Sequence, residues 1–158
     1  MTAVKQAATE FLAQKRIAVT GVSRDGKTHG ANVVYQRLRE RGYDVFAVNP
    51  NASNVEGDLT FPSLHAIPGG VDAVVIGTAA ERAPATMREA VELGVHHVWM
   101  HRSFGAGSVS REATEYGRAH DVTVIAGGCP LMFAPTSDGG HKVIKSVCRL
   151  TGALPRKV

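Results

Sequence analysis

A glycine-containing loop with hydroxyl and basic side chains is the segment of this sequence best suited to chemistry. It follows an apolar run at positions 16–22 and reads Gly21-Val22-Ser23-Arg24-Asp25-Gly26-Lys27-Thr28-His29-Gly30. Four of its side chains can give hydrogen bonds or positive charge to an anion: Ser23, Thr28, Arg24 and Lys27. A helix that begins at Gly30 would add free backbone N–H groups. The loop therefore predicts a phosphate or pyrophosphate site, with His29 beside it.

Alternating apolar and amphipathic stretches position this loop. The apolar runs predict five strands, at residues 16–22, 44–49, 71–77, 96–101 and 122–126. Helical spacing predicts helices at residues 2–14, 30–41, 84–93, 108–119 and about 140–150. The connections are short except for residues 51–70, which we expect to be a loop-rich segment.

Strands that alternate with helices predict a fold in the α/β class. We expect one domain over residues 1–158, a Rossmann-like doubly wound sheet of about five parallel strands with helices on both faces. The simplest strand order is 3-2-1-4-5, which puts residues 71–77 outside residues 44–49. Ligands of such sheets bind at the carboxyl ends of the strands where the winding reverses, which is where the loop after the first strand lies.

The glycine spacing of this loop and the end of the second predicted strand indicate which phosphorylated ligand fits. The dinucleotide fingerprint G-x-G-x-x-G is missing, because the glycines fall at 21, 26 and 30. Sites for NAD usually end the second strand with an acidic residue, whereas this chain has Asn49-Pro50-Asn51. A ribose that carries a phosphate would meet no carboxylate there. This favours coenzyme A over NAD and leaves NADP open.

Several short segments, in this order, resemble the CoA-binding domain family, whose members are similar to the N-terminal domain of the succinyl-CoA synthetase α subunit. The resemblance runs from about residue 10 to residue 135. It rests on Gly21-Val22-Ser23-Arg24, Gly42-Tyr43-Asp44-Val45, Val48-Asn49-Pro50, Glu56-Gly57, Val98-Trp99-Met100 and Cys129-Pro130-Leu131.

The resemblance implies coenzyme A or an acyl-CoA as the ligand and assigns residues to its parts. The residues that it implies around the phosphates are Ser23, Arg24, Asp25, Gly26 and Thr28. Asn49 and Pro50 would border the adenosine end, and Thr78-Ala79-Ala80 would form the opposite wall. Met100, His101 and Arg102 would point towards the pantetheine arm.

Catalysis by this chain alone is left open, and we expect binding instead. The synthetase that the chain resembles carries its phosphorylated histidine on a second domain, for which 158 residues leave no room. Cys129 could attack a thioester or form a disulfide with the ligand, and it could equally be a buried, inert thiol. The alternative function is an oxidoreductase or redox sensor that uses NAD(P).

Charge and composition narrow the partners. The net charge of +4 suits an anionic ligand, but the basic residues are scattered, so we do not expect nucleic acid. The cysteines show no metal-ligand spacing, and no segment is apolar enough for a signal peptide or a membrane span. We therefore expect a cytoplasmic protein without a metal. A homodimer or a partner enzyme is compatible with the sequence, which demands neither.

Overall fold

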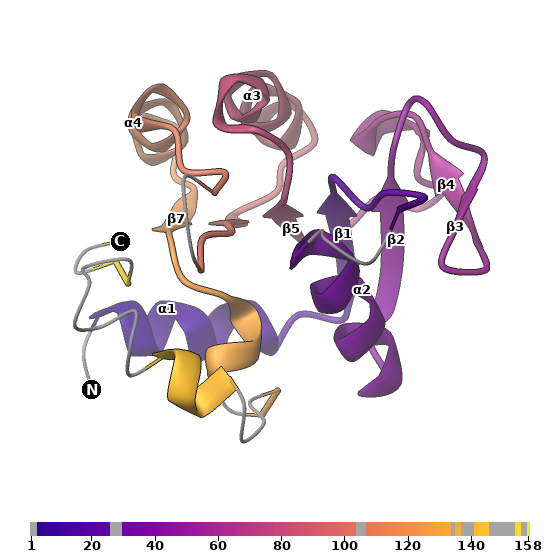
Figure 1. The fold of residues 1–158 in the computed structure, drawn as a ribbon. Coiled ribbons are helices and arrows are strands. Elements are labelled where there is room, and N and C mark those ends of the chain that lie inside the picture. The colour runs from indigo at the N-terminus through magenta and orange to yellow at the C-terminus, as the bar shows by residue number, and fades with distance from the viewer. Residues whose placement is uncertain are drawn as a thin grey trace.

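A twisted sheet forms the centre of the protein. The computed structural model describes residues 3–25, 30–103, 107–133, 135–136, 141–145, 154–155 and 158. Within these residues, seven strands hydrogen-bond in the order β3-β4-β2-β1-β5-β6-β7 (Figure 1). Their bounds are β1 (Arg16–Thr20), β2 (Asp44–Val48), β3 (Asn54–Val55), β4 (Asp58–Phe61), β5 (Ala73–Ile76), β6 (His97–Met100) and β7 (Thr123–Ala126). Every pairing is parallel except that of β3 with β4. The Rossmann-like α/β class is therefore confirmed.

The predicted strand order was right in pattern but wrong in one assignment. The third strand of the prediction, now β5, pairs with β1 and does not lie outside β2. That outer place belongs to β4, which pairs with β2 through Ala47 with Thr60 and Val48 with Phe61. With β4 counted as the third parallel strand, the six parallel strands follow the dinucleotide-fold order 3-2-1-4-5-6.

The segment at residues 51–70 is thus not only a loop, because it contains the β3–β4 hairpin. These two strands have two and four residues, and Leu59 on β4 is 70% exposed. Such short strands at a sheet edge leave little apolar pattern in the sequence. The hairpin stands at the edge of the sheet opposite to β7 (Figure 1).

Helices cover both faces of the sheet, as predicted. Their bounds are α1 (Ala3–Leu12), α2 (Gly30–Glu40), α3 (Ala83–Glu92) and α4 (Arg111–Ala119). Helices α1 and α2 pack on one face, and α3 and α4 pack on the other (Figure 1). Residues 141–145 are also helical, and the rest of the predicted helix at 140–150 lies outside the described residues.

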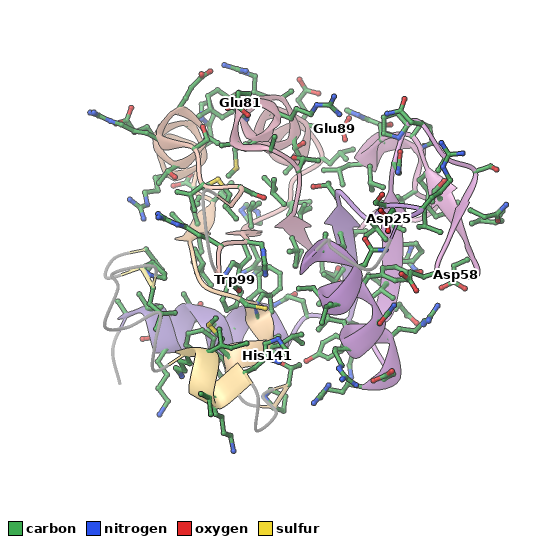
Figure 2. All side chains as sticks on the ribbon, viewed as in Figure 1. Asp25, Asp58, Glu81, Glu89, Trp99 and His141 are labelled. Atoms are coloured by element: carbon green, nitrogen blue, oxygen red, sulfur yellow. The ribbon has the colours of Figure 1, made fainter. Side chains whose placement is uncertain are left out.

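Strand side chains alternate between two cores because successive residues of a strand point to opposite faces. Ile17 and Val19 join the core under α1 and α2, whereas Ala18 joins the core under α3 and α4. Trp99 is fully buried on the α1 side, where Figure 2 labels it, and packs edge-on against Phe11. Its indole N–H donates to the carbonyl of Gly127 at 2.9 Å, so the one polar group of the buried ring has a hydrogen-bond partner.

Among the described residues, none of the helices has the length and apolar character that crossing a bilayer requires.

Candidate ligand site at the carboxyl ends of the strands

The backbones after β1 and β5 touch directly at the point where the sheet winding reverses. Gly21 has φ +80°, and a Cβ built on it would lie 2.3 Å from the carbonyl oxygen of Gly77. A Cβ on Gly77 would in turn lie 2.6 Å from the Cβ of Ala31 in the first turn of α2. Only glycine allows three segments to approach so closely. The loop, the end of β5 and the start of α2 therefore form one compact corner.

The first turn of α2 faces this corner. The opening N–H groups of a helix have no intrahelical partner and carry a partial positive charge, so they attract anions. His101, after β6, lies against the same turn, because a Cβ on Gly30 would come 2.8 Å from its Cε1 atom. A glycine at the start of α2 thus makes room for the imidazole.

The described part of the loop, residues 21–25, is held by amide side chains. Asn32 is fully buried, accepts from the Ser23 backbone N–H at 2.8 Å and donates to the Ser23 carbonyl at 2.7 Å. Asn49 donates to the carbonyl of Val22 at 3.0 Å. The Ser23 hydroxyl accepts from the Asp25 N–H at 3.2 Å. These contacts fix the loop backbone in one conformation.

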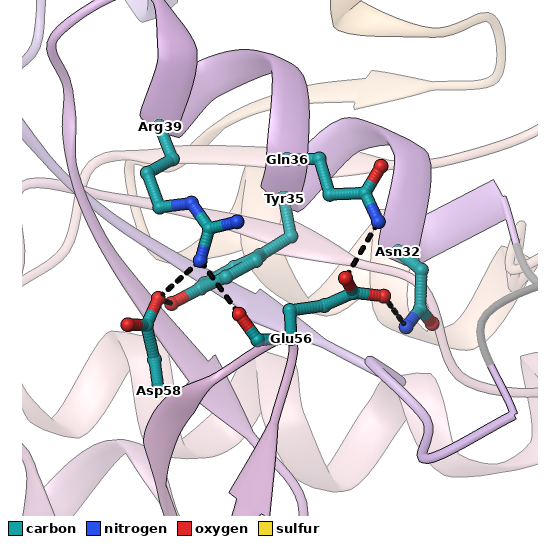
Figure 3. A network of polar contacts seen from close by, with 6 residues as sticks. All are labelled: Asn32, Tyr35, Gln36, Arg39, Glu56 and Asp58. Atoms are coloured by element: carbon teal, nitrogen blue, oxygen red, sulfur yellow. Dashed lines mark hydrogen bonds and ion pairs between the residues drawn. The ribbon is translucent and has the colours of Figure 1, made fainter.

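A carboxylate on the β3–β4 hairpin holds Asn32 in turn. Glu56 accepts from the Asn32 side chain at 2.7 Å and from the Gln36 side chain at 2.6 Å (Figure 3). These two hydrogen bonds, the one from Asn32 foremost, lower the pKa of the Glu56 carboxyl. Glu56 therefore stays ionised and remains an acceptor for both amides.

A cavity of about 470 Å³ opens beside the corner, and we call it the histidine cavity. Its lining includes Gly30, Thr78, Ala79, His101, Cys129 and His141. Burial, with a smaller contribution from nearby His141, lowers the pKa of His101 to about 4. The His101 imidazole is therefore neutral at physiological pH and offers a hydrogen bond rather than a charge. The Cys129 thiol is buried in the wall, with 1% of the residue exposed.

A second cavity of about 400 Å³, the proline cavity, lies between the end of β2 and the start of α3. Pro50 and Pro62 line it, together with Arg82 and Glu89. Thr78, the residue that follows the Gly21–Gly77 contact, lines both cavities.

The predicted site residues fall into three groups. Gly21, Asn49, Pro50, Thr78, Ala79 and His101 come together around the corner and the two cavities, and Ser23, Arg24 and Asp25 continue the loop from that corner. Gly26, Thr28 and His29 lie outside the described residues. Met100 lies apart from the others, because its side chain is fully buried in the core under α3 and α4. Ala80 begins the short η2 turn (Ala80–Arg82) that leads into α3, and Val22 is buried in the core on the other face.

Sequence reasoning missed Asn32 as a site residue. A signal was available, because Asn32 shares its helix face with the apolar residues Ala31, Tyr35 and Leu38. A buried amide in such a place needs hydrogen-bond partners, and a nearby loop backbone supplies them.

The fold and the corner define a Rossmann-like α/β protein, and comparisons with known proteins narrow the class. A family model described as the CoA binding domain matches residues 15–135. The chain belongs to this CoA-binding domain family.

The relatives include free-standing proteins and a much larger enzyme. The chain is 30% identical to the uncharacterized protein YneT of Bacillus subtilis over 115 residues, which are 73% of this chain and 82% of YneT. It is 34% identical to the ADP-forming acetate–CoA ligase II of Archaeoglobus fulgidus over 83 residues, which are 51% of this chain but only 12% of the ligase. Among solved structures, a hypothetical protein from Pyrococcus horikoshii matches with a TM-score of 0.73 and 27% identity, over 80% of this chain and 87% of that protein.

Proposed function

We propose that this chain binds coenzyme A or an acyl-CoA through the loop after β1. The Thr78 hydroxyl is the observation that carries the proposal. It is buried and has no hydrogen-bond partner among the described residues, and Thr78 lines both cavities. Buried polar groups are rarely left unsatisfied, so a hydroxyl in this position fits a contact with a polar ligand.

The two cavities suit the two halves of an elongated ligand. The phosphates would lie beside residues 21–25 and the first turn of α2, where N–H groups and Arg24 can reach them. The adenosine would lie near Pro50 in the proline cavity, whose wall includes the cation Arg82. The pantetheine arm and its thiol would extend into the histidine cavity. Membership in the CoA-binding domain family supports this assignment of the ligand.

The main alternative is a site for NAD(P) that serves redox chemistry. In that class an acidic residue at the end of the second strand binds the ribose hydroxyls. Here Asn49 occupies that place, and its amide is engaged with the Val22 carbonyl and the Asn51 N–H. A ribose would therefore meet an amide that is already hydrogen-bonded within the protein, instead of an acidic acceptor.

Calorimetric titration with coenzyme A, acetyl-CoA, NADH and NADPH at modest salt tests the proposal. We expect micromolar binding of coenzyme A, because phosphate contacts and a preformed loop both contribute. Binding of a dinucleotide without coenzyme A would overturn the proposal and favour the redox alternative.

Replacement of Thr78 by valine sharpens the test. Thr78→Val keeps the side-chain shape and removes a buried hydroxyl that has no partner in the described protein, so we expect unfolding stability to stay equal or rise slightly. Binding of coenzyme A should weaken about tenfold, because the ligand loses a buried hydrogen bond. Unchanged affinity in this variant would mean that the ligand does not contact the Thr78 hydroxyl.

We further propose that residues 1–158 act as one ligand-binding domain and that thioester chemistry requires a partner enzyme. Incubation of the protein with acetyl-CoA, followed by detection of the released thiol, tests this. We expect release at the buffer rate, and faster release that Cys129→Ala abolishes would show that the chain is itself an enzyme.

A further inference from the structure

The polar contacts between α2 and the β3–β4 hairpin form two halves with different neighbours (Figure 3). In one half, Asp58 accepts from the Tyr35 hydroxyl at 2.6 Å and from Arg39 at 2.7 Å. In the other half, Glu56 accepts from Asn32 and Gln36. Arg39 joins the halves, because it also donates to the Glu56 backbone carbonyl. Among the described residues, only the Glu56 carboxylate continues to the loop after β1, because Asn32 also binds both backbone groups of Ser23.

The geometry of Asn32 leaves it one way to satisfy its amide. Its Oδ1 atom accepts from the Ser23 N–H, so its Nδ2 group must face acceptors. Those acceptors are the Ser23 carbonyl and one oxygen of Glu56. Without Glu56, one N–H of a fully buried side chain would lose its partner, and only the two hydrogen bonds to Ser23 would hold the amide in place.

The backbone of Glu56 adopts a conformation that favours glycine. Glu56 has φ +52°, in the left-handed region where residues with a side chain are disfavoured. Gly57 follows with φ +81°, so the turn would accept glycine at position 56 as well. The carboxylate is present although a glycine would suit the backbone better, and Arg39 further ties the turn by donating to the Glu56 carbonyl at 2.8 Å.

We infer that Glu56 is a positioning residue for the ligand loop: through Asn32 it holds residues 22–24 in the conformation that receives the ligand's phosphates. The ligand part of this inference rests on the proposed function, and the loop part does not. A loop that samples other conformations binds more weakly in proportion to the fraction that remains competent.

Two substitutions of Glu56 separate loop positioning from backbone strain and from charge. Glu56→Gly removes the carboxylate while relieving the positive φ, so it spares the fold. Glu56→Gln also removes the charge but keeps an oxygen for Asn32, and Gln36 can turn its own amide to accept from the new NH₂ group. We expect Glu56→Gly to weaken binding of coenzyme A about tenfold and Glu56→Gln to stay within about twofold of the wild type.

Amide hydrogen exchange gives a readout that needs no ligand. The Ser23 N–H donates to Asn32, so its exchange should accelerate in Glu56→Gly and remain slow in Glu56→Gln. Asp58→Asn is the matched control, because it weakens the contacts of Asp58 with Tyr35 and Arg39 but leaves the Glu56 carboxylate and its two amide partners in place. It should lower stability and leave both Ser23 exchange and the affinity for coenzyme A unchanged.

The outcomes separate the two proposals. If the wild type does not bind coenzyme A, the proposed function fails, and Ser23 exchange in Glu56→Gly still decides whether Glu56 positions the loop. If the wild type binds and Glu56→Gly matches it in affinity and in Ser23 exchange, the positioning role is overturned. Equal weakening by Asp58→Asn would also overturn it, since the whole hairpin would then act as general support.

Discussion

The two ends of the candidate site are built in opposite ways. Around Ser23, backbone groups are held by the buried amide of Asn32, which an ionised carboxylate holds in turn, and the cation Arg24 is exposed beside them. Around His101, the wall consists of small residues, a buried thiol and an imidazole whose pKa is strongly lowered. The first end suits a charged group of fixed shape, whereas the second suits a weakly polar arm. Affinity should therefore come mainly from the first end, and discrimination among acyl groups from the second.

The rigidity of the first end is tested most severely by Gly21→Ala. The new methyl group would lie 2.3 Å from the Gly77 carbonyl oxygen, on a backbone with φ +80°. Strain and overpacking together should lower the free energy of unfolding by about 4 kcal/mol. Urea denaturation measures this loss.

Gly42→Ala is the control for the strain alone. Gly42 has φ +84°, and a Cβ there would meet no atom within 4 Å. Its cost should be only about 1–2 kcal/mol. If both variants lost the same stability, the close approach of the two strand ends would not contribute to the rigidity of the corner.

The second end, around His101, should make the unfolding stability of the protein depend on pH. The pKa of His101 is lowered from 6.5 to about 4, so the unfolded chain takes up a proton at a higher pH than the folded chain does. The stability linked to His101 is therefore complete above pH 6.5 and is lost as the pH falls towards 4. By linkage, roughly 3 kcal/mol of unfolding free energy should disappear between pH 7 and pH 4.

His101→Gln should lose correspondingly less stability over the same range, because glutamine does not titrate. Denaturation of both proteins at pH 7 and pH 4 gives the difference, and the NMR titration of the His101 ring proton gives the pKa directly. A midpoint near 6.5 would show that the imidazole is hydrated and that the two ends of the site differ less than the structure indicates.

The same contrast explains what the sequence could reveal. The loop at residues 21–30 was recognisable because its glycines, hydroxyls and cations are local features. The predicted strand order was wrong at β4, because a strand of four residues with an exposed Leu59 shows no clear alternation of apolar and polar residues. Asn32 and Glu56 were missed as partners because their contact joins residues 24 positions apart, which no local pattern encodes.

The direction of the Met100 side chain could also be predicted from the sequence, since strand alternation is enough to place it. The neighbour of Trp99 on the same strand must point to the opposite face of the sheet. The structure indeed puts Trp99 under α1 and Met100 under α3 and α4. The place of a residue in a candidate segment therefore does not fix the face of the sheet to which its side chain points.

The charge of the first end is tested by Arg24→Ala. If Arg24 pairs with a ligand phosphate, its loss should cost about 1.5–3 kcal/mol of binding free energy, the range for a hydrogen bond to a charged group. Arg111→Ala removes the same charge from a 91% exposed side chain at the start of α4, and so reports the effect of net charge alone. We expect this control to bind coenzyme A as the wild type does in calorimetry. Equal affinities for all three proteins would mean that the phosphates do not contact Arg24 and that the N–H groups of α2 are their main partners.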